Sequence, residues 1–282
     1  MTGREIARLA FELKSAPRVP VTIVGGGAWA VHHAGKTFAQ IKNDPAQIAD
    51  AFIRYCRLCG HDLLWMGSNF INYPIHFLGC ALKDDSSDYP ALEGSVIKSL
   101  DEMETLSIEK VMKHPTMQAI LEAHNLVSNA VGKETLVIPT NWAPFTFAAR
   151  ILGVENTMMA TISDPDRLTR LIEFATDLIW SIVESVIAHP DVLEIEPHCF
   201  SLENKVPLKT AKDVLGGKVC IAGNISPTGA FLTGRPEEVI DEAKSCLAVW
   251  GEDPGYILTV GCDFSKDVPL ENMMALMSFK KF

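Results

Sequence analysis

Short β-branched segments alternate along the chain with longer amphipathic ones, and this alternation restricts the possible folds more than any other feature. Six of the short segments are bounded by Gly, Pro, Asp or Asn, as strand ends require. They predict strands at Pro20–Val24, Asp62–Met66, Thr135–Pro139, Val192–Glu196, Lys218–Ala222 and Tyr256–Val260. Because these segments are apolar almost without interruption, we expect a parallel sheet that is buried on both faces.

The stretches between these strands have helical periodicity, and a proline usually stands in the first turn, which is a typical helix start. They predict helices at Pro45–Cys59, Pro115–Val131, Pro144–Ile162, Pro165–Ala188, Pro207–Leu215, Pro236–Trp250 and Pro269–Ser278. The segment Gly79–Glu109 is richer in Asp and Ser and carries no clear strand, so we interpret it as an insertion or a long loop. Over 282 residues, this order predicts one α/β domain, residues 1–282, folded as a β/α barrel.

An eight-stranded barrel needs two more βα units than this sequence supplies. The predicted helix that ends at Ala188 is followed by the strand at Val192 after only His189–Asp191. At roughly 30 residues for each βα unit, about two units are missing near residues 186–190. We therefore predict a (β/α)8 barrel that is either shortened or interrupted at this place.

The charge and the cysteine content exclude several classes of protein. A net charge of −10 without a basic cluster argues against nucleic-acid binding, because phosphate contacts need grouped Lys and Arg. No run of eighteen apolar residues occurs and charges interrupt Met1–Pro20, so we expect no membrane span, no signal peptide and a cytoplasmic location. Seven cysteines, an odd number, indicate free thiols or metal ligands rather than a disulfide framework.

Barrel active sites are assembled at the carboxyl ends of the strands, and Cys262 and Asp263 directly follow the last predicted strand. A thiolate at Cys262 is a natural zinc ligand, and a small buried core thiol is the alternative. Asp263 can orient a substrate or accept a hydrogen bond from a ligand. Asn141 and Asn224 also close strands, where each can contact substrate or cap the following helix.

Glu194, Glu196 and His198 alternate along one predicted strand and its exit, so they point to the same side. Carboxylates are costly against a helix layer, which favours an inward orientation. Glu196 and His198 are then a candidate metal-binding or acid/base pair, together with Asn224 as a catalytic candidate. A plain loop with Glu194 in a structural hydrogen bond is the alternative.

The segment Gly25–His33 follows the first predicted strand. Trp29 and His32 are candidate substrate-binding residues there, with His33 beside them, although a solvated loop histidine is equally compatible with the sequence. The glycines at 25–27 lack the spacing of a phosphate loop and predict a tight turn that allows the close approach of a large planar ligand. The Cys-x-x-Cys pair Cys56 and Cys59 lies in a predicted helix and is best explained by ordinary packing.

The C-terminal third resembles the uroporphyrinogen decarboxylase superfamily. The resemblance rests on Gly223-Asn224 after a strand, Thr233–Val239 at a helix start, Gly261-Cys262 after the last strand, and Pro269–Asn272 opening the last helix. Weaker similarity covers Arg18–Val21, Trp142–Thr146 and Asp164-Pro165. The resemblance implies a (β/α)8 barrel of the uroporphyrinogen decarboxylase type.

This superfamily contains two chemistries. True decarboxylases carry arginines after the first strand for the substrate propionates, whereas Gly25–His33 has none. The other branch consists of corrinoid-dependent methyltransferases, whose zinc-containing members use a His-x-Cys pair and a cysteine after the last strand. Cys262 matches that last cysteine, while the His-x-Cys element has no counterpart and would fall near residues 186–190.

The resemblance therefore implies a methyltransferase that moves a methyl group between a small substrate, such as a thiol, a methoxy-aromatic compound or a methylamine, and the cobalt of a corrinoid. The corrinoid is expected on a separate partner protein. Zinc is expected at Cys262, completed by Glu196 or His198 or by residues of the missing segment. The alternatives are decarboxylation of a porphyrinogen by a carboxy-lyase, and a non-catalytic protein that binds a corrinoid or a small ligand.

Overall fold

The computed structural model describes residues 1–67, 70–84, 89–187 and 199–281. Its strands are β1 (Leu63–Met66), β2 (Ala81–Lys83), β3 (Ala91–Glu93), β4 (Leu136–Pro139), β5 (Cys199–Ser201), β6 (Cys220–Ile225) and β7 (Tyr256–Val260). Its helices are α1 (Gly3–Phe11), α2 (Gly27–His33), α3 (Phe38–Ile41), α4 (Pro45–Cys59), α5 (Tyr73–Leu78), α6 (Ile108–Met112), α7 (Pro115–Val131), α8 (Pro144–Leu152), α9 (Val154–Ser163), α10 (Pro165–Ile187), α11 (Leu208–Leu215), α12 (Ala230–Thr233), α13 (Pro236–Trp250) and α14 (Leu270–Met277). Short 3-10 turns are η1 (Phe70–Asn72), η2 (Leu100–Thr105) and η3 (Ser278–Lys281).

Apart from the β2–β3 hairpin, the described strands that pair with each other are parallel and follow one another along the chain. β5, β6 and β7 form one parallel sheet, and β1 pairs in parallel with β4. The segment 20–24 joins the two sheets, because Val21 bridges Leu258 of β7 and its carbonyl oxygen accepts a hydrogen bond from the Asp62 amide at 3.2 Å. The first predicted strand thus lies between the last strand and the second, which is how a barrel closes. The strand predicted at Val192–Glu196 lies outside the described residues.

The segment Gly79–Glu109 differs from its prediction, since it contains a strand pair. β2 and β3 form an antiparallel hairpin that stands apart from the parallel strands. Each strand has three residues and is largely exposed, so neither carries the apolar run by which the buried strands are recognised. The hairpin belongs to the insertion and does not alter the parallel order of the barrel.

The interior of the strand array is apolar and is covered by α1 at one end. Leu63, Leu136 and Ile257 pack with Ala7 and Ala10 of that helix, and all of them are buried. α1 itself begins with a capping box in which the Thr2 side chain and the Glu5 side chain satisfy each other's backbone amides. Since α1 packs against the strands at their amino ends, the carboxyl ends remain for a functional site.

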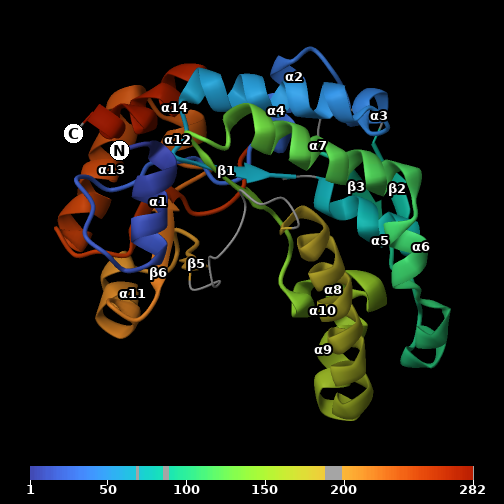
Figure 1. Cartoon of the computed structure of the whole chain (residues 1–282). Coiled ribbons are helices and arrows are strands. Elements are labelled where there is room, and N and C mark those ends of the chain that lie inside the picture. Colours follow the sequence, from blue (N-terminus) through green and yellow to red (C-terminus); the bar gives the residue numbers. More distant parts are fainter. Residues whose placement is uncertain (68–69, 85–88, 188–198, 282) are drawn as a thin grey trace.

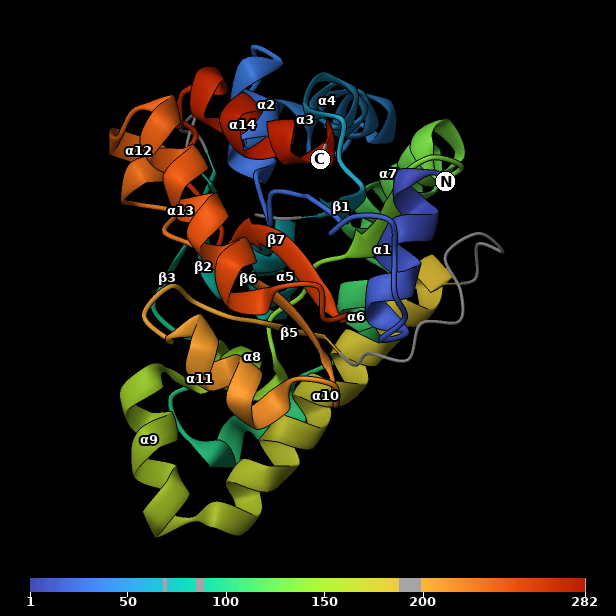
Figure 2. The ribbon, with the colours of Figure 1, turned by 90° about the vertical axis from the view of Figure 1, so that its left-hand side faces the viewer.

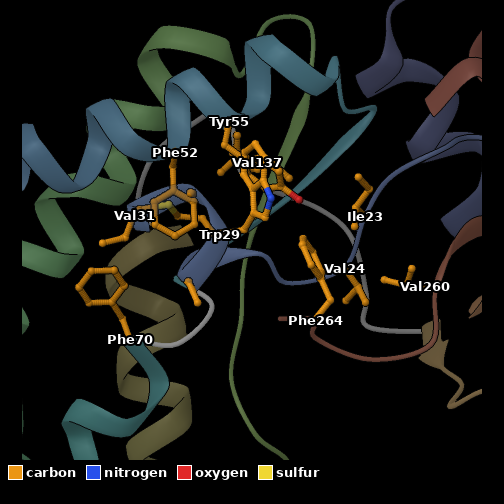
Figure 3. Close-up of a cluster of buried hydrophobic side chains, with 14 of the residues drawn as sticks. Ile23, Val24, Trp29, Val31, Phe52, Tyr55, Phe70, Val137, Val260 and Phe264 are labelled. Carbon is orange, nitrogen blue, oxygen red and sulfur yellow. The ribbon is translucent and has the colours of Figure 1, made fainter. Parts of the chain in front are cut away.

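The second and larger part of the core lies between the strands and the helices α2, α4 and α7. Figure 3 shows Trp29 beside Tyr55, with Phe52 and Val31 nearby. Gly27–His33 forms α2 rather than the predicted loop, and Trp29 is only 1% exposed. Its indole Nε1 donates a hydrogen bond to the Val268 carbonyl oxygen at 3.0 Å. The side chain of Trp29 therefore stabilises the contact between α2 and the segment before α14.

The helices α8, α9 and α10 extend away from the strands, as Figures 1 and 2 show. The predicted helix Pro144–Ile162 is interrupted at Gly153, whose φ of 91° is incompatible with a continuous helix and separates α8 from α9. α10 returns along both helices and contacts α8 most extensively. None of the described helices is long and apolar enough to cross a membrane.

Candidate active site

A cavity of about 560 Å³ opens where the carboxyl ends of several strands meet. Its walls come from the segments after residues 20–24, β1, β4 and β7, together with α8 and the β2–β3 hairpin. The lining residues are Ala28, Ile71, Asn72, Tyr89, Ala91, Leu92, Trp142, Arg150, Asp263, Phe264, Ser265 and Lys266. Parallel strands deliver their following loops to one rim, so this is the position expected for a barrel active site.

Asp263 is held in a fixed position at this cavity. Its Oδ1 accepts hydrogen bonds from the backbone amides of Gly26 at 2.8 Å and Phe264 at 2.9 Å. Gly25 has a φ of 79°, and a Cβ atom on it would lie 2.1 Å from Asp263 Oδ1. The close approach predicted for the glycines at 25–27 is therefore made, at Gly25, by a carboxylate of the same chain. The amide donors orient a negative charge toward the cavity.

Two cations and an indole lie on other walls of the cavity. The Arg150 guanidinium stands 5.0 Å from the centre of the Trp142 ring, a distance at which cation–π attraction is effective. Lys266 forms an ion pair with Asp267, with Nζ and Oδ1 2.8 Å apart. The cavity thus offers a carboxylate, a flat aromatic surface and a guanidinium group that stacks on this aromatic surface.

Cys262 is the second residue after β7 and is exposed beside Asp263. The residue before it, Gly261, packs so closely on the loop after β5 that a Cβ atom would lie 2.8 Å from the Leu202 carbonyl oxygen. A cysteine thiol is a ligand type that zinc prefers, but the described residues contain no group of three or more His, Cys, Asp or Glu able to hold a metal. The donors described here therefore do not by themselves form a zinc site. The predicted residues Glu194, Glu196 and His198 lie outside the described residues.

Asn224 does not line the cavity. Its Nδ2 donates a hydrogen bond to the Val206 carbonyl oxygen at 2.7 Å, and its Oδ1 accepts one from the Cys246 thiol of α13 at 3.8 Å. The side chain is buried and fastens the loop after β5 to β6 and α13. This geometry corresponds to a structural role, in contrast to the predicted catalytic one.

The other predicted residues are distributed around the same end of the molecule. Asn141 borders a small pocket between α7 and α10. His32 is exposed on α2. The hydrogen bond from Lys266 is the main cause that lowers the pKa of Asp267, and His32 makes a smaller contribution. Trp29 was predicted to bind substrate, but it is buried in the core and does not line the cavity. Of the predicted site residues within the described part of the chain, Asp263 lines the cavity and Cys262 adjoins it.

Four residues that line the cavity were not predicted from the sequence as site residues, namely Trp142, Arg150, Tyr89 and Lys266. Trp142 directly follows Asn141 after β4, so its place after a strand was a usable signal. Arg150 reaches the cavity only because α8 lies beside it, and Tyr89 belongs to the inserted hairpin. No local pattern in the sequence marks either residue.

Arg18 and the histidines of the barrel wall are structural. The Arg18 guanidinium makes two hydrogen bonds to the buried Asp62 carboxylate, at 2.6 and 3.0 Å, on the amino side of β1. Burial lowers the pKa of His61 and of His124 to about 3, so both rings are neutral. Cys56 and Cys59 are buried in α4, and burial raises the pKa of Cys59 to about 12, which confirms their interpretation as packing residues.

Comparison with solved structures confirms the barrel. A methyltransferase from Methanosarcina mazei superposes with a TM-score of 0.84 over 100% of this chain and 98% of that protein, at 19% sequence identity. The chain is also 25% identical, over an alignment 258 positions long, to a methylated-thiol–coenzyme M methyltransferase from Methanosarcina mazei, covering 73% of this chain and 68% of the relative. A uroporphyrinogen decarboxylase from Campylobacter fetus subsp. fetus is 20% identical over an alignment 303 positions long, with 86% of each chain covered.

A family model described as uroporphyrinogen decarboxylase (URO-D) matches almost the whole chain in two segments, residues 4–189 and 183–281. The two segments meet where the sequence analysis expects missing βα units, and that expectation stays a prediction. The family resemblance predicted from the last third of the chain is confirmed over its full length. The chain belongs to the uroporphyrinogen decarboxylase (URO-D) family.

Proposed function

We propose that this protein transfers a methyl group between a small substrate and the cobalt of a corrinoid that a separate protein carries. The observation that carries the proposal is the cavity at the strand ends, which has a volume of about 560 Å³ and few cationic groups. The similarity to a methylated-thiol–coenzyme M methyltransferase supports the same reaction class. The transferred methyl group undergoes an SN2 displacement, so the site must align a nucleophile, a methyl carbon and a leaving group.

The cation content of the cavity argues against decarboxylation of a porphyrinogen. Such a substrate carries four acetate and four propionate groups, which need cationic partners. The described walls supply Arg150 and Lys266, and Lys266 is already paired with Asp267. The loop after β7 supplies Asp263, a negative charge, which the Gly26 amide in the turn after the first strand holds at the cavity. The rim that faces an incoming ligand is thus poorly suited to a polyanion.

The residues of the cavity would orient the small substrate in this reaction. Trp142 offers a flat apolar surface, and the stacked Arg150 can donate hydrogen bonds to a polar end of the substrate. Asp263 can accept a hydrogen bond from a thiol, a hydroxyl or the corrinoid periphery, because it lines the cavity and two backbone amides fix its orientation. These contacts would place the methyl carbon toward the open mouth, where the partner protein presents its corrinoid.

Zinc is part of this proposal. Bound at Cys262, it would stabilise a substrate thiolate and so supply a nucleophile at neutral pH. A His-x-Cys element in the segment predicted near residues 186–190 would complete the set of ligands. Replacing the exposed Cys262 by Ala should remove zinc and methyl transfer while the free energy of unfolding in urea changes by less than about 0.5 kcal/mol. Full zinc content and full activity in that variant would show that Cys262 is not a zinc ligand.

The experiment that tests the function follows methylcobalamin by its visible spectrum. Purified protein with one equivalent of zinc is mixed with methylcobalamin and a panel of thiols, and in the reverse direction cob(I)alamin is mixed with methylated thiols, methoxy-aromatic compounds and methylamines. Demethylation with multiple turnovers supports the proposal. Release of a less carboxylated porphyrinogen from uroporphyrinogen, without any methyl transfer, would establish decarboxylation instead. Binding of a corrinoid without turnover of any substrate would indicate a non-catalytic binding protein.

A further inference from the structure

Two free cysteines face each other on neighbouring strands. Cys199 is the first residue of β5 and Cys220 the first of β6, and they are direct partners in the parallel register. Neighbouring strands lie about 4.8 Å apart, which falls within the Cα separation of about 4.4–6.8 Å that a disulfide requires. Among the strand pairs that the structure describes, no other register places two cysteines opposite each other. Figure 2 shows β5 and β6 side by side.

The two side chains also point in the same direction. Both belong to the apolar cluster inside the strand array, where Cys220 is fully buried and Cys199 packs against it partly buried. A hydrogen bond between the two thiols, together with burial, raises the pKa of Cys220. The two thiols are therefore neighbours in the fold, and no change of strand register is needed to join them.

The surroundings give the two thiols different access to solvent. Cys220 lies on the central strand of its sheet, between β5 and β7, and is 0% exposed. Cys199 is partly exposed and lies on β5, which in the described part of the sheet pairs only with β6. A small oxidant in solution can thus reach Cys199 and not Cys220.

We propose that Cys199 and Cys220 are a redox modification site that a peroxide converts reversibly into an intrachain disulfide. Hydrogen peroxide transfers one oxygen to the Cys199 sulfur, giving a sulfenic acid and one water molecule. The Cys220 sulfur then attacks the Cys199 sulfur, the S–O bond breaks, and the hydroxyl group leaves as a second water molecule with the Cys220 proton. In total, two thiols and one peroxide give one disulfide and two water molecules, and a dithiol reductant reverses the change.

The site is independent of the proposed methyl transfer, because it lies at the beginning of β5 and β6 while the cavity lies at the opposite ends of the strands. Its formation would join the edge strand covalently to the central one. Reaction at this pair can therefore be measured in protein that shows no methyltransferase activity.

Peptide mapping of the full chain tests the proposal. The folded protein is treated with hydrogen peroxide at neutral pH, alkylated with N-ethylmaleimide after unfolding, and digested with trypsin without reductant. Tryptic cleavage yields peptides 171–205 and 219–244, which contain Cys199 and Cys220 as their single cysteines. We expect these two peptides as one linked species, an intact mass lower by about 2 Da before alkylation, and restoration by dithiothreitol.

Two controls make the result decisive. In Cys262→Ala the link should form as in the parent protein, whereas in Cys220→Ser the Cys199 peptide should gain oxygen atoms and form no link. Protein oxidised in guanidinium chloride should give a mixture of links, which separates proximity in the fold from general reactivity. Recovery of Cys220 as an alkylated thiol beside an over-oxidised Cys199 in the parent protein would overturn the proposal, as would loss of the link in Cys262→Ala.

Discussion

The contact between Gly25 and Asp263 can be tested by a double-mutant cycle. In Gly25→Ala, the new Cβ would lie 2.1 Å from Asp263 Oδ1, and the backbone would hold a non-glycine residue at a φ of 79°. The left-handed backbone costs about 1–2 kcal/mol. The carboxylate must also move and lose its two amide hydrogen bonds, at about 1 kcal/mol each. We expect a loss of about 3–4 kcal/mol in the free energy of unfolding.

The second substitution of the double-mutant cycle removes the Asp263 carboxylate that an added Cβ at residue 25 would meet. Asp263→Ala should cost about 2 kcal/mol for the same two hydrogen bonds. On that background Gly25→Ala should cost only about 1–2 kcal/mol, because the new Cβ then meets the Cβ of residue 263 at 3.0 Å instead of an oxygen at 2.1 Å. The double variant should therefore be about 2 kcal/mol more stable than the sum of the single effects predicts.

Urea unfolding of the four proteins measures these values, with Gly35→Ala as a matched control. Gly35 has a φ of 71° and nothing within 4 Å of an added Cβ, so this variant isolates the backbone cost of about 1–2 kcal/mol. Additivity of the two substitutions within about 0.5 kcal/mol would refute the contact. A loss in Gly25→Ala no larger than in Gly35→Ala would refute it as well.

Three further predictions concern the rest of the molecule. Burial opposes the ionisation of Asp62, but Arg18, the Val21 amide and Lys280 outweigh burial and lower the pKa of Asp62. The ionised Asp62 therefore stabilises the folded protein above about pH 4, and this stabilisation is lost as pH falls through the folded pKa. Asp62→Asn should cost about 3 kcal/mol at pH 7 and weaken the pH dependence of urea unfolding below pH 4, and an unchanged acid profile would contradict this. Trp142→Ala should raise the KM of the methyl-transfer substrate about tenfold, equivalent to about 1.4 kcal/mol, with little change in kcat. Trp180→Ala, on the exposed side of α10, should change neither KM nor kcat. The protein from its natural source should have an intact mass well above 30.9 kDa if βα units belong near residues 186–190, and a mass of 30.9 kDa would exclude them.

The elements that the sequence predicts well are those whose ends are set by local chemistry. α4 begins and ends as predicted, because the Asp44 side chain accepts hydrogen bonds from two amides of the first turn, Pro45 follows it, and Gly60 takes a φ of 70° at the end. α2 was missed because its first residue and the two residues before it are glycines, which favour a loop when only neighbours in sequence are considered. Its helical form depends on burial of Trp29 between α4 and the segment before α14, which is a tertiary effect.

The candidate site was predictable only where a residue follows a strand directly. Asp263 was found for this reason, and the same rule applied to Asn224, which the structure turns toward α13 instead. The rule gives the rim on which a residue lies, but the direction of its side chain depends on what packs behind it. Arg150 shows the converse, since it lies in a helix and reaches the cavity through the placement of α8 beside Trp142.

The position of Arg18 shows how one family scaffold can serve different chemistries. Arginines near the first strand are what the resemblance implies for decarboxylases, and this chain does place an arginine there. However, Arg18 precedes the strand and is neutralised by the buried Asp62, so its charge lies at the amino ends of the strands. At the carboxyl ends the corresponding turn carries Gly25 and Gly26, whose backbone holds a carboxylate. The first strand thus has a neutralised arginine at its amino end and the Asp263 carboxylate beside the turn at its carboxyl end, which agrees with the proposed substrate, small and not polyanionic.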